Sequence, residues 1–471
     1  MSNKFEYFLL ISCLISAVTA SIIVQVPNDC YEENEDIEKY EPTWGSLDSR
    51  PIPNWYDEAK IGIMLHWGVY SVPDRGSEWF WFNWRANQKN YVDYMKEHYP
   101  PGFTYQDFGK AFKTELFDPV YWAKLFEDAG AKYVVLTSKH HDGYAMWPSK
   151  YAFSWNSMDL GAHRDLIGDL AEAIRNNTDL KFGLYYSLYE WFNPIYLADK
   201  ANCFESNDFV NNKMLPEMFE LVTKYRPSIF WADGDWEASD AYFMTRKFLT
   251  WLYNDSPVKN EIVVNDRWGV GIPCHHGGYF TCRDRYDPGV LQPHKWENAM
   301  TLDKQSWGYR REARLDDYLT TKELITVLIR TIACGGNILI NVGPTKEGLI
   351  DPIFEERLRE LGAWLEINGK AVYNTKPWDY QNDTLTADVW FTTPKVNNSA
   401  VIYAFMVDWP ESNVLEIEVL HPYLSPRCTV RILGEPQDSQ WTLTLDTVQV
   451  LLPSLIHTQS TNCWVLAFTC I

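Results

Sequence analysis

The sequence has few basic residues and, after its first twenty positions, no long hydrophobic segment. Its 471 residues include 42 Lys and Arg against 63 Asp and Glu, which gives a formal net charge of −21. Such a charge repels the phosphate backbone of nucleic acids and anionic membrane surfaces. No later stretch approaches the run of about eighteen apolar residues that spans a bilayer. These absences exclude nucleic acid as a partner and exclude insertion into a membrane.

The sequence also lacks the short motifs of several enzyme classes. No glycine-rich dinucleotide or phosphate loop follows a predicted strand, and no serine-hydrolase elbow is present. His140 and His141 are neighbours, so at a strand end they face opposite ways and do not easily share one metal ion. The cluster Cys274–Gly277 has no second CysXaaXaaCys to complete a zinc ribbon. We therefore expect no metal and no cofactor. Hydrolysis that depends on carboxylate side chains remains as the expected chemistry.

Residues 1–20 have the pattern of a signal peptide. Lys4 supplies a positive start, Phe8–Ala17 is apolar, and Val18–Ala20 ends in small residues before a cut at Ser21. This pattern predicts a secreted or lysosomal protein. Possible acceptors for N-glycosylation agree with that route, and they are Asn176, Asn254, Asn382 and Asn397.

Cysteine usage fits an oxidising compartment. Nine cysteines become eight when Cys13 leaves with the signal peptide, and an even number there favours disulfides. We expect a Cys274–Cys282 bridge and Cys334 as a buried free thiol. A second bridge is expected within the set Cys428, Cys463 and Cys470.

From about residue 60 to residue 345 the chain repeats one unit, a short apolar run that ends in polar or aromatic residues and is followed by an amphipathic helix. Apolar runs buried on both faces are typical of parallel strands. At least five runs end in catalytic-type side chains, which favours a (β/α)8 TIM-like barrel over a doubly wound open sheet. Helices are expected near residues 118–130, 164–176, 209–225, 242–253, 321–334 and 352–368.

The pattern of apolar and polar residues changes after about residue 373. Short alternating runs separated by turn residues predict an antiparallel β-sandwich there. The predicted organisation is a signal peptide at 1–20, a catalytic barrel domain at 21–373 and a C-terminal sandwich domain at 374–471.

Phe230–Glu237 is the most informative segment. Asp233 directly follows a buried strand and precedes Gly234, so it is a candidate nucleophile on a rigid support, and Trp231 points to the same side of the strand. Asp235 and Glu237 are interpreted as supporting or solvated. The aromatic share of 15% hints at sugar binding, and Trp67 is among the aromatic residues expected at the strand ends beside a ligand.

Eight segments occur in the order seen in animal α-L-fucosidases of glycoside hydrolase family twenty-nine, which the mature chain resembles over nearly its whole length. They are Met64–Pro73, Ser77–Trp81, Ser138–Tyr144, Tyr185–Ser187, Trp231–Glu237, Val264–Gly269, Cys274–Tyr279 and His294–Glu297. The resemblance implies removal of terminal L-fucose with retention, and it assigns the nucleophile to Asp233. The sugar-binding positions that it implies are His66, Glu78, Trp79, His140, His141, Tyr186, Trp231 and Arg267.

The acid/base is open between two carboxylates, because family members place it differently. Glu297 lies near the beginning of the expected sixth strand, away from the catalytic face. Asp284 lies in the loop after the fifth strand, and we favour it. Ala299 stands where animal relatives commonly have a cysteine, and we expect an effect on packing.

Fucosylated glycans are the expected partners, and the family often forms homo-oligomers. Two alternatives stay open: a lectin-like fucose-binding protein without turnover, and a glycosidase for another sugar. The preferred fucose linkage is not fixed by the sequence.

Overall fold

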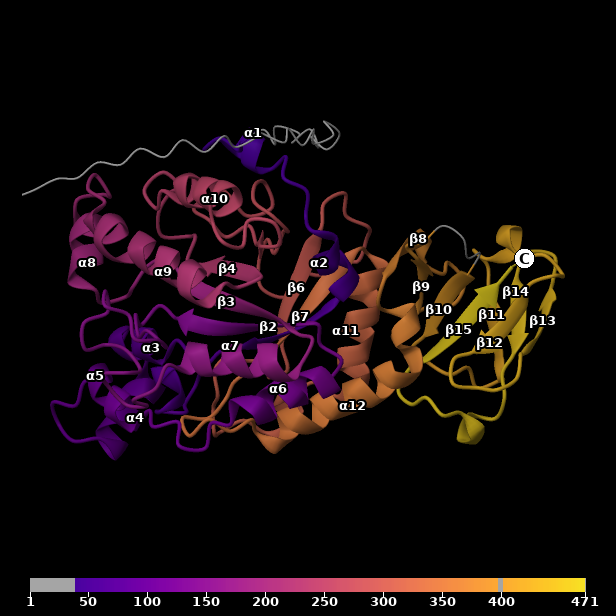
Figure 1. Ribbon diagram of the computed structural model, residues 1–471. Helices are drawn as coiled ribbons and strands as arrows, with labels where there is room; N and C mark the ends of the chain where they lie inside the picture. Colours follow the sequence, from indigo (N-terminus) through magenta and orange to yellow (C-terminus); the bar gives the residue numbers. More distant parts are fainter. Residues whose placement is uncertain (1–38, 397–400, 471) are drawn as a thin grey trace, which may run out of the picture. The chain divides into compact units, whose positions relative to one another are not determined.

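The computed structural model describes residues 39–396 and 401–470. Its larger part is built on a parallel sheet with the strand order β5-β4-β3-β2-β1-β7-β6 (Figure 1). The strands are β1 Ile61–Leu65, β2 Tyr133–Lys139, β3 Lys181–Ser187, β4 Ile229–Asp233, β5 Val263–Val264, β6 Trp296–Thr301 and β7 Gly336–Val342. Consecutive strands are neighbours almost throughout, as in a barrel of β/α units. Almost every residue of these strands is buried, which explains the continuous apolar runs.

The expected eighth strand is replaced by a short segment at residues 278–281. The amide of Tyr279 donates to the Val264 carbonyl of β5 at 3.0 Å. Phe280 pairs in parallel with Trp296 of β6, and its amide donates to the Lys295 carbonyl at 2.9 Å. The two edges of the seven-stranded sheet are therefore joined through this segment, which closes the barrel. The prediction of a TIM-like barrel is confirmed, with the difference that one of the eight strands is reduced to this short segment.

Helices cover the outside of the sheet (Figure 1), and the six helices predicted from the sequence are all present. They are α6 Pro119–Asp128, α7 Leu166–Asn177, α9 Leu215–Tyr225, α10 Thr245–Asn254, α11 Thr321–Ala333 and α12 Pro352–Asn368. Asp118 caps α6 by accepting hydrogen bonds from the amides of Val120 and Tyr121, both at 3.0 Å, ahead of a proline at the first helical position. A π-helical turn, Val210–Met214, leads into α9.

Further helices lie before β1 and in the connections between the strands. They are α1 Trp44–Leu47, α2 Asn54–Ala59, α3 Phe80–Arg85, α4 Lys89–His98, α5 Tyr105–Phe108 and α8 Pro194–Ala201. Among the described residues, no helix has both the length and the apolar character needed to cross a membrane.

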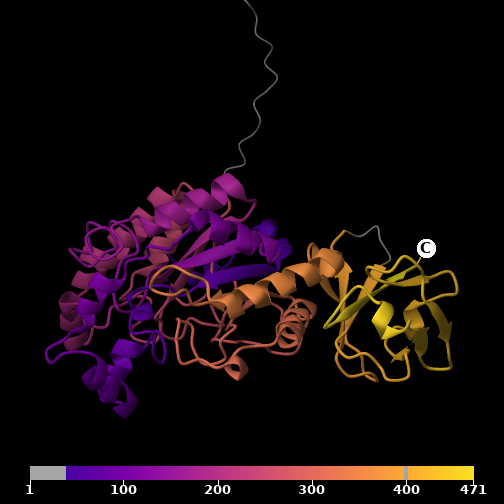
Figure 2. The ribbon, with the colours of Figure 1, turned by 90° about the horizontal axis from the view of Figure 1, so that it is seen from below.

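After α12, the long orange helix in Figure 2, the chain forms two antiparallel sheets. One has the order β12-β15-β10-β9-β8 and the other β11-β14-β13. The strands are β8 Thr375–Asn382, β9 Val389–Pro394, β10 Val401–Met406, β11 Val414–Ile417, β12 Thr429–Ile432, β13 Gln440–Leu443, β14 Val448–Leu451 and β15 Trp464–Thr469. Inward side chains of both sheets share one apolar core, as expected for a sandwich.

The barrel and these sheets contact each other through α12. The Trp364 indole donates to the Cys463 carbonyl at 2.9 Å, and the Asn368 amide donates to Ser460 Oγ at 3.0 Å. Both contacts are buried, and α11 also packs against β8 and β9.

The disulfide predictions are confirmed for the described cysteines. Cys274 is bonded to Cys282, and Cys428 to Cys470. Cys334 is free and buried, as expected. The predicted signal peptide and Asn397 lie outside the described residues.

Candidate active site

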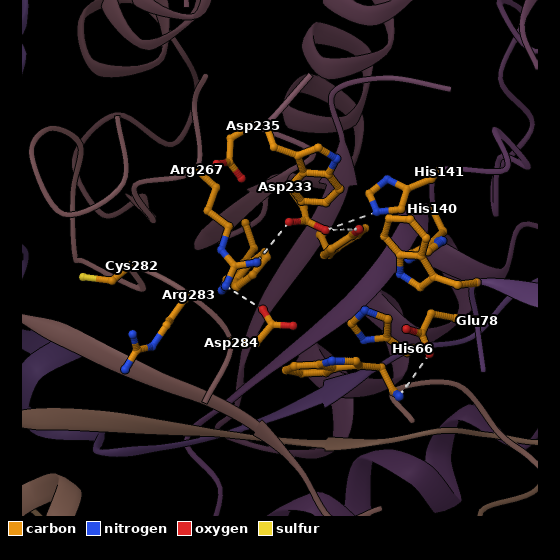
Figure 3. A pocket seen from close by; sticks show the side chains of 15 residues that line it. His66, Glu78, His140, His141, Asp233, Asp235, Arg267, Cys282, Arg283 and Asp284 are labelled. Atoms are coloured by element: carbon orange, nitrogen blue, oxygen red, sulfur yellow. Dashed lines mark hydrogen bonds and ion pairs between the residues drawn. The ribbon is translucent and has the colours of Figure 1, made fainter. Parts of the chain in front are cut away.

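A pocket of about 440 Å³ opens where the barrel strands end (Figure 3). Most sequence-predicted site residues meet there, although they come from β4 and from the loops after β1, β2, β5 and the segment at residues 278–281. Its lining consists of His66, Glu78, Trp79, His140, His141, Tyr185, Trp231, Asp233, Asp235, Trp236, Arg267, Cys282, Arg283, Asp284 and Trp307. Convergence of side chains at the carboxyl ends of strands is the usual place for a barrel enzyme's active site.

Asp233, the last residue of β4, is held in the pocket by a tyrosine and an arginine. Tyr185 Oη donates to its Oδ2 at 2.7 Å, and Arg267 Nη1 donates to its Oδ1 at 3.1 Å. His141 Nε2 lies 3.5 Å from Oδ2. Burial alone would raise the pKa of Asp233, but the Arg267 charge and these neighbours outweigh it and hold the pKa below its ordinary value. The carboxylate is therefore ionised at neutral and mildly acidic pH.

Arg267 connects Asp233 to a second carboxylate. Its Nη2 donates to Asp284 Oδ1 at 2.7 Å (Figure 3). Its Nε donates to Thr281 Oγ1 at 3.1 Å. Its guanidinium carbon lies 4.7 Å from the centre of the Trp231 ring, a cation–π contact. These contacts hold the Arg267 side chain in place, and its two hydrogen bonds orient the carboxylates of Asp233 and Asp284.

The loop that carries Asp284 is anchored below the pocket. Asp266 Oδ2 accepts hydrogen bonds from the amides of Cys274, at 2.8 Å, and Cys282, at 3.0 Å. The Cys274–Cys282 disulfide closes the same loop. The Asp284 side chain is 45% exposed against 10% for Asp233, so the two carboxylates occupy the open and the closed side of the pocket.

Three histidines line the closed side in the neutral state. Burial lowers the pKa of His66 and of His141 to about 4, and it lowers that of His140 well below the usual value. His66 Nδ1 lies 2.9 Å from Asn341 Oδ1, and His141 Nδ1 lies 2.7 Å from Ser187 Oγ. Because Asn341 Oδ1 is an acceptor, the neutral His66 donates from Nδ1 and keeps Nε2 as an acceptor.

Glu78 and Trp79 enter from the segment before α3. Glu78 Oε2 accepts hydrogen bonds from the amides of Trp307 and Gly308, both at 3.0 Å, and burial raises the pKa of this carboxyl. The Trp79 ring packs edge-on against Trp191 at 5.3 Å between centroids. Both side chains therefore belong to the wall of the pocket.

Two residues that the sequence placed beside the ligand lie outside the pocket lining. Tyr186 does not line the pocket, since its hydroxyl donates to Glu217 at 2.8 Å on the helical side of β3. Trp67 is buried against Phe112, Phe117 and Trp122, outside the pocket lining.

Glu297 also lies outside the lining, although it is inside the barrel. It is fully buried, and its oxygens accept hydrogen bonds from Tyr56 Oη at 2.7 Å, Tyr133 Oη at 2.7 Å and Trp231 Nε1 at 3.0 Å. Its position at the start of β6 agrees with the expectation that it is remote from the open face. Ala299, two residues on, is buried in the interior cluster that contains Tyr185 and Trp231.

Sequence reasoning missed Tyr185, Trp307, Asp235 and Trp236 as lining residues. Register explains Tyr185: it is level with Trp231, and Ser187 with Asp233, so Tyr185 shares the inward side with both. The adjacent tyrosines of Tyr185–Ser187 do not by themselves show which one faces inward. Trp307 lies in a loop without a strand pattern. Within the described parts of the chain, no cluster of three or more His, Cys, Asp or Glu is arranged to hold a metal ion.

Comparisons with known proteins agree with this geometry. Residues 30–370 match the family model "Alpha-L-fucosidase", and residues 381–469 match "Alpha-L-fucosidase C-terminal domain". An alpha-L-fucosidase of Branchiostoma floridae is 57% identical over 405 residues, which is 86% of this chain and 89% of that protein. The human plasma alpha-L-fucosidase is 51% identical over 437 residues, covering 92% of each chain.

Solved structures agree as well. The Thermotoga maritima alpha-fucosidase in complex with fucose matches with a TM-score of 0.78 and 31% identity, over 91% of this chain and all of that one. Two family models cover most of the sequence, and these two relatives are more than half identical to it over the aligned residues. The chain therefore belongs to the α-L-fucosidase family.

Proposed function

We propose that the protein is an exo-acting α-L-fucosidase that hydrolyses terminal α-L-fucose from glycans with retention of configuration. The observation that carries this proposal is the state of Asp233: an ionised carboxylate, held by Tyr185 and Arg267, in a pocket that also contains Asp284. Membership of the α-L-fucosidase family indicates that the sugar is fucose. The two carboxylates provide the nucleophile and the acid/base.

Asp233 acts as the nucleophile. Its carboxylate oxygen forms a bond to the anomeric carbon while the bond from that carbon to the leaving oxygen breaks. The hydrogen bonds from Tyr185 and Arg267 orient the carboxylate before substrate arrives, so little reorganisation is needed during the reaction.

Asp284, rather than Glu297, is the acid/base. It delivers a proton to the leaving oxygen in the first step and takes a proton from the attacking water in the second, which releases fucose and regenerates Asp233. Its exposure on the open side of the pocket suits this role, whereas Glu297 is enclosed by three donors. Retaining enzymes hold their carboxyl groups about 5–5.5 Å apart, closer than inverting ones, and bridging of Asp233 and Asp284 by one guanidinium supports the closer arrangement.

The remaining lining recognises the sugar. Neutral His66, His140 and His141 can exchange hydrogen bonds with hydroxyl groups, and Glu78 adds an acceptor. Aromatic faces such as Trp231 can contact the apolar methyl group of the deoxysugar. This division between donors and an aromatic wall is typical of small-molecule pockets.

The test is hydrolysis of an aryl α-L-fucoside by the wild type and by Asp233→Ala. The wild type should release the phenol, and the variant should lose nearly all activity while azide restores part of it and yields β-L-fucosyl azide. Full activity of Asp233→Ala would sink the assignment. Binding of fucose without hydrolysis at any pH would favour a lectin, and faster cleavage of another glycoside would favour a different sugar.

Location and domain roles complete the proposal. Relatives from plasma and tissue support a secreted or lysosomal protein, with a cleaved signal peptide at 1–20, catalysis in 21–373 and a supporting sandwich at 374–471. Asn176 and Asn382 are exposed and are proposed glycan acceptors. Asn254 is a poorer acceptor, because its Nδ2 donates to the Tyr40 carbonyl at 2.8 Å and its Oδ1 accepts from the Tyr40 amide at 3.0 Å.

A further inference from the structure

The pocket has a part that recognition of one fucose does not use. Around Asp233 the lining is buried, with exposed fractions of 0% for Tyr185, 2% for Trp231 and 6% for His66. On the open side Trp236 is 45% exposed, and Asp235 beside it is partly buried. A terminal sugar fills the closed end first, so whatever it is attached to must lie against the open side.

We propose that Asp235 and Trp236 form the binding site for the sugar that carries the fucose, a neutral pyranose that lays its C–H face on the indole and hydrogen-bonds the carboxyl group. The inference rests on the proposed function and deepens it. It assigns a leaving-group site to two consecutive residues that follow the nucleophile in the chain.

Trp236 is held as a fixed surface. Its ring stacks on Trp79 at 6.0 Å with an interplanar angle of 29°, and it meets His141 edge-on at 5.4 Å and Tyr189 edge-on at 5.9 Å. Three aromatic neighbours thus immobilise the ring, although nearly half of its surface is exposed. A flat, preorganised apolar face next to a pocket costs little entropy when a ligand binds it.

Asp235 is a carboxyl group without a protein partner. Among the described residues, no other residue donates a hydrogen bond to it, whereas Asp233 and Asp284 both bind Arg267. Burial raises the pKa of Asp235 to about 7, against the opposing charge of Arg267. A lining carboxyl with unused hydrogen-bonding capacity is available to sugar hydroxyls, and Asp235 carries a proton to donate at mildly acidic pH.

The offset between this site and the nucleophile is set by Gly234. Its φ of +88° is unfavourable for other residues, and a Cβ atom there would lie 2.6 Å from the Tyr189 ring. The chain therefore turns sharply after Asp233, and Asp235 and Trp236 line the same pocket. Figure 3 shows Asp235 beside Arg267 and Asp233. Both residues therefore lie next to the nucleophile in the pocket lining, with Trp236 on the side of Trp79 and His141.

The test compares two substrates that share fucose and differ in the leaving group. α-L-Fucosyl fluoride has no second sugar, whereas α-L-fucosyl-(1→2)-galactose has one. For Trp236→Ala and Asp235→Asn, kcat/KM on the disaccharide should fall at least about tenfold more than kcat/KM on the fluoride, mainly through KM. The matched control is Phe153→Ala, which removes an aromatic side chain that is 92% exposed and outside this pocket; its two ratios should stay equal.

Equal losses on both substrates, or no loss on either, would overturn the leaving-sugar site. Asp235→Asn keeps the side-chain volume, so it still tests the site if Trp236→Ala does not fold. Product inhibition gives a second readout: galactose should inhibit fluoride hydrolysis by the wild type and inhibit either variant at least several-fold more weakly. A wild type that cleaves neither substrate contradicts the proposed function itself, a result distinct from loss of the preference.

Discussion

Arg267 donates from Nη1 to Asp233 Oδ1 at 3.1 Å, at the point where β4 ends. The same guanidinium donates from Nη2 to Asp284 at 2.7 Å. One cation therefore sets the charge of the proposed nucleophile and the position of the proposed acid/base. The sequence places these residues up to 51 positions apart, at Asp233, Arg267 and Asp284.

Arg267→Met should raise the pKa of Asp233, because it removes the strongest opposing charge while burial continues to favour the protonated form. The acid limb of the kcat/KM profile for an aryl fucoside should move to higher pH. Loss of two charge-assisted hydrogen bonds should also lower kcat/KM by about 100-fold or more at the optimum.

Arg267→Lys is the control for charge without the fork geometry. It should lose activity but shift the acid limb less than Arg267→Met. An unchanged acid limb in both variants would contradict the role given to Arg267.

The adjacent tyrosines of β3 offer a matched pair of single-atom deletions. Tyr185→Phe removes the 2.7 Å hydrogen bond to Asp233 and should reduce kcat/KM about 10- to 100-fold, since bonds to charged groups contribute about 1.5–3 kcal/mol. Tyr186→Phe removes a bond to Glu217 on the other face of the sheet. It should keep at least half of the activity and lower the free energy of unfolding instead.

Steady-state kinetics and urea unfolding of the two variants separate these effects. The reverse pattern, with Tyr186→Phe as the inactive variant, would restore the placement that the sequence suggested. Circular dichroism before each assay shows whether a loss of activity reflects misfolding.

These tyrosines also illustrate what the sequence could and could not predict. Apolar runs, caps and periodicity predicted the barrel, its six main helices and the sandwich. They could do so because the spacing of apolar residues along a helix or strand shows which of its faces is buried. The alternation of a strand correctly paired Trp231 with Asp233. It failed at Tyr185 and Tyr186, because two similar residues in a row give no phase, and only the register with β4 supplies it.

Other parts of the site depend on contacts that no local pattern encodes. Trp307 reaches the pocket because its amide binds Glu78, 229 positions earlier in the chain. The segment at residues 278–281, which takes the place of the eighth strand, is only four residues long, and its backbone pairing with β5 and β6 defines it. Motif resemblance predicted most residues of the pocket lining. The sequence already favoured Asp284 over Glu297, and Asp284 lines the pocket whereas Glu297 does not.

That separation can be tested with substrates of different leaving-group quality. Asp284→Ala should lose about 100-fold or more on a fucosyl disaccharide, which needs protonation of the leaving oxygen, and much less on an aryl fucoside with an acidic phenol. Glu297→Gln should not show this selectivity. Its main effect should be a loss of stability of about 1–3 kcal/mol, because the amide cannot accept from three donors as the carboxylate does.

The assay is the ratio of kcat/KM values on the two substrates, with thermal unfolding measured alongside. Leaving-group selectivity in Glu297→Gln and its absence in Asp284→Ala would reverse the assignment.

A buried charge network behind the histidines gives the last prediction. Lys139 Nζ lies 2.8 Å from Glu190 Oε1, with side chains 0% and 5% exposed, and Lys213 lies 3.3 Å from the same oxygen and 2.7 Å from Glu217. Lys139→Met leaves Glu190 with Lys213 at the longer distance of 3.3 Å, so the free energy of unfolding should fall by about 3–5 kcal/mol. Lys110→Met is the control: its partner Asp107 is a surface residue and Lys110 is 70% exposed, so its removal should cost about 1 kcal/mol or less.

The network also predicts how stability depends on pH. Burial would raise the pKa of Glu190, but Lys139 and Lys213 outweigh it, so its pKa in the folded protein lies below the ordinary glutamate value of about 4.3. Its stabilising contribution is therefore present above that value and is lost as the pH falls through the folded pKa. Between about pH 5 and pH 3, urea unfolding should show a smaller loss of stability for Lys139→Met than for the wild type. Parallel curves for the two proteins would mean that Lys139 does not control the ionisation of Glu190.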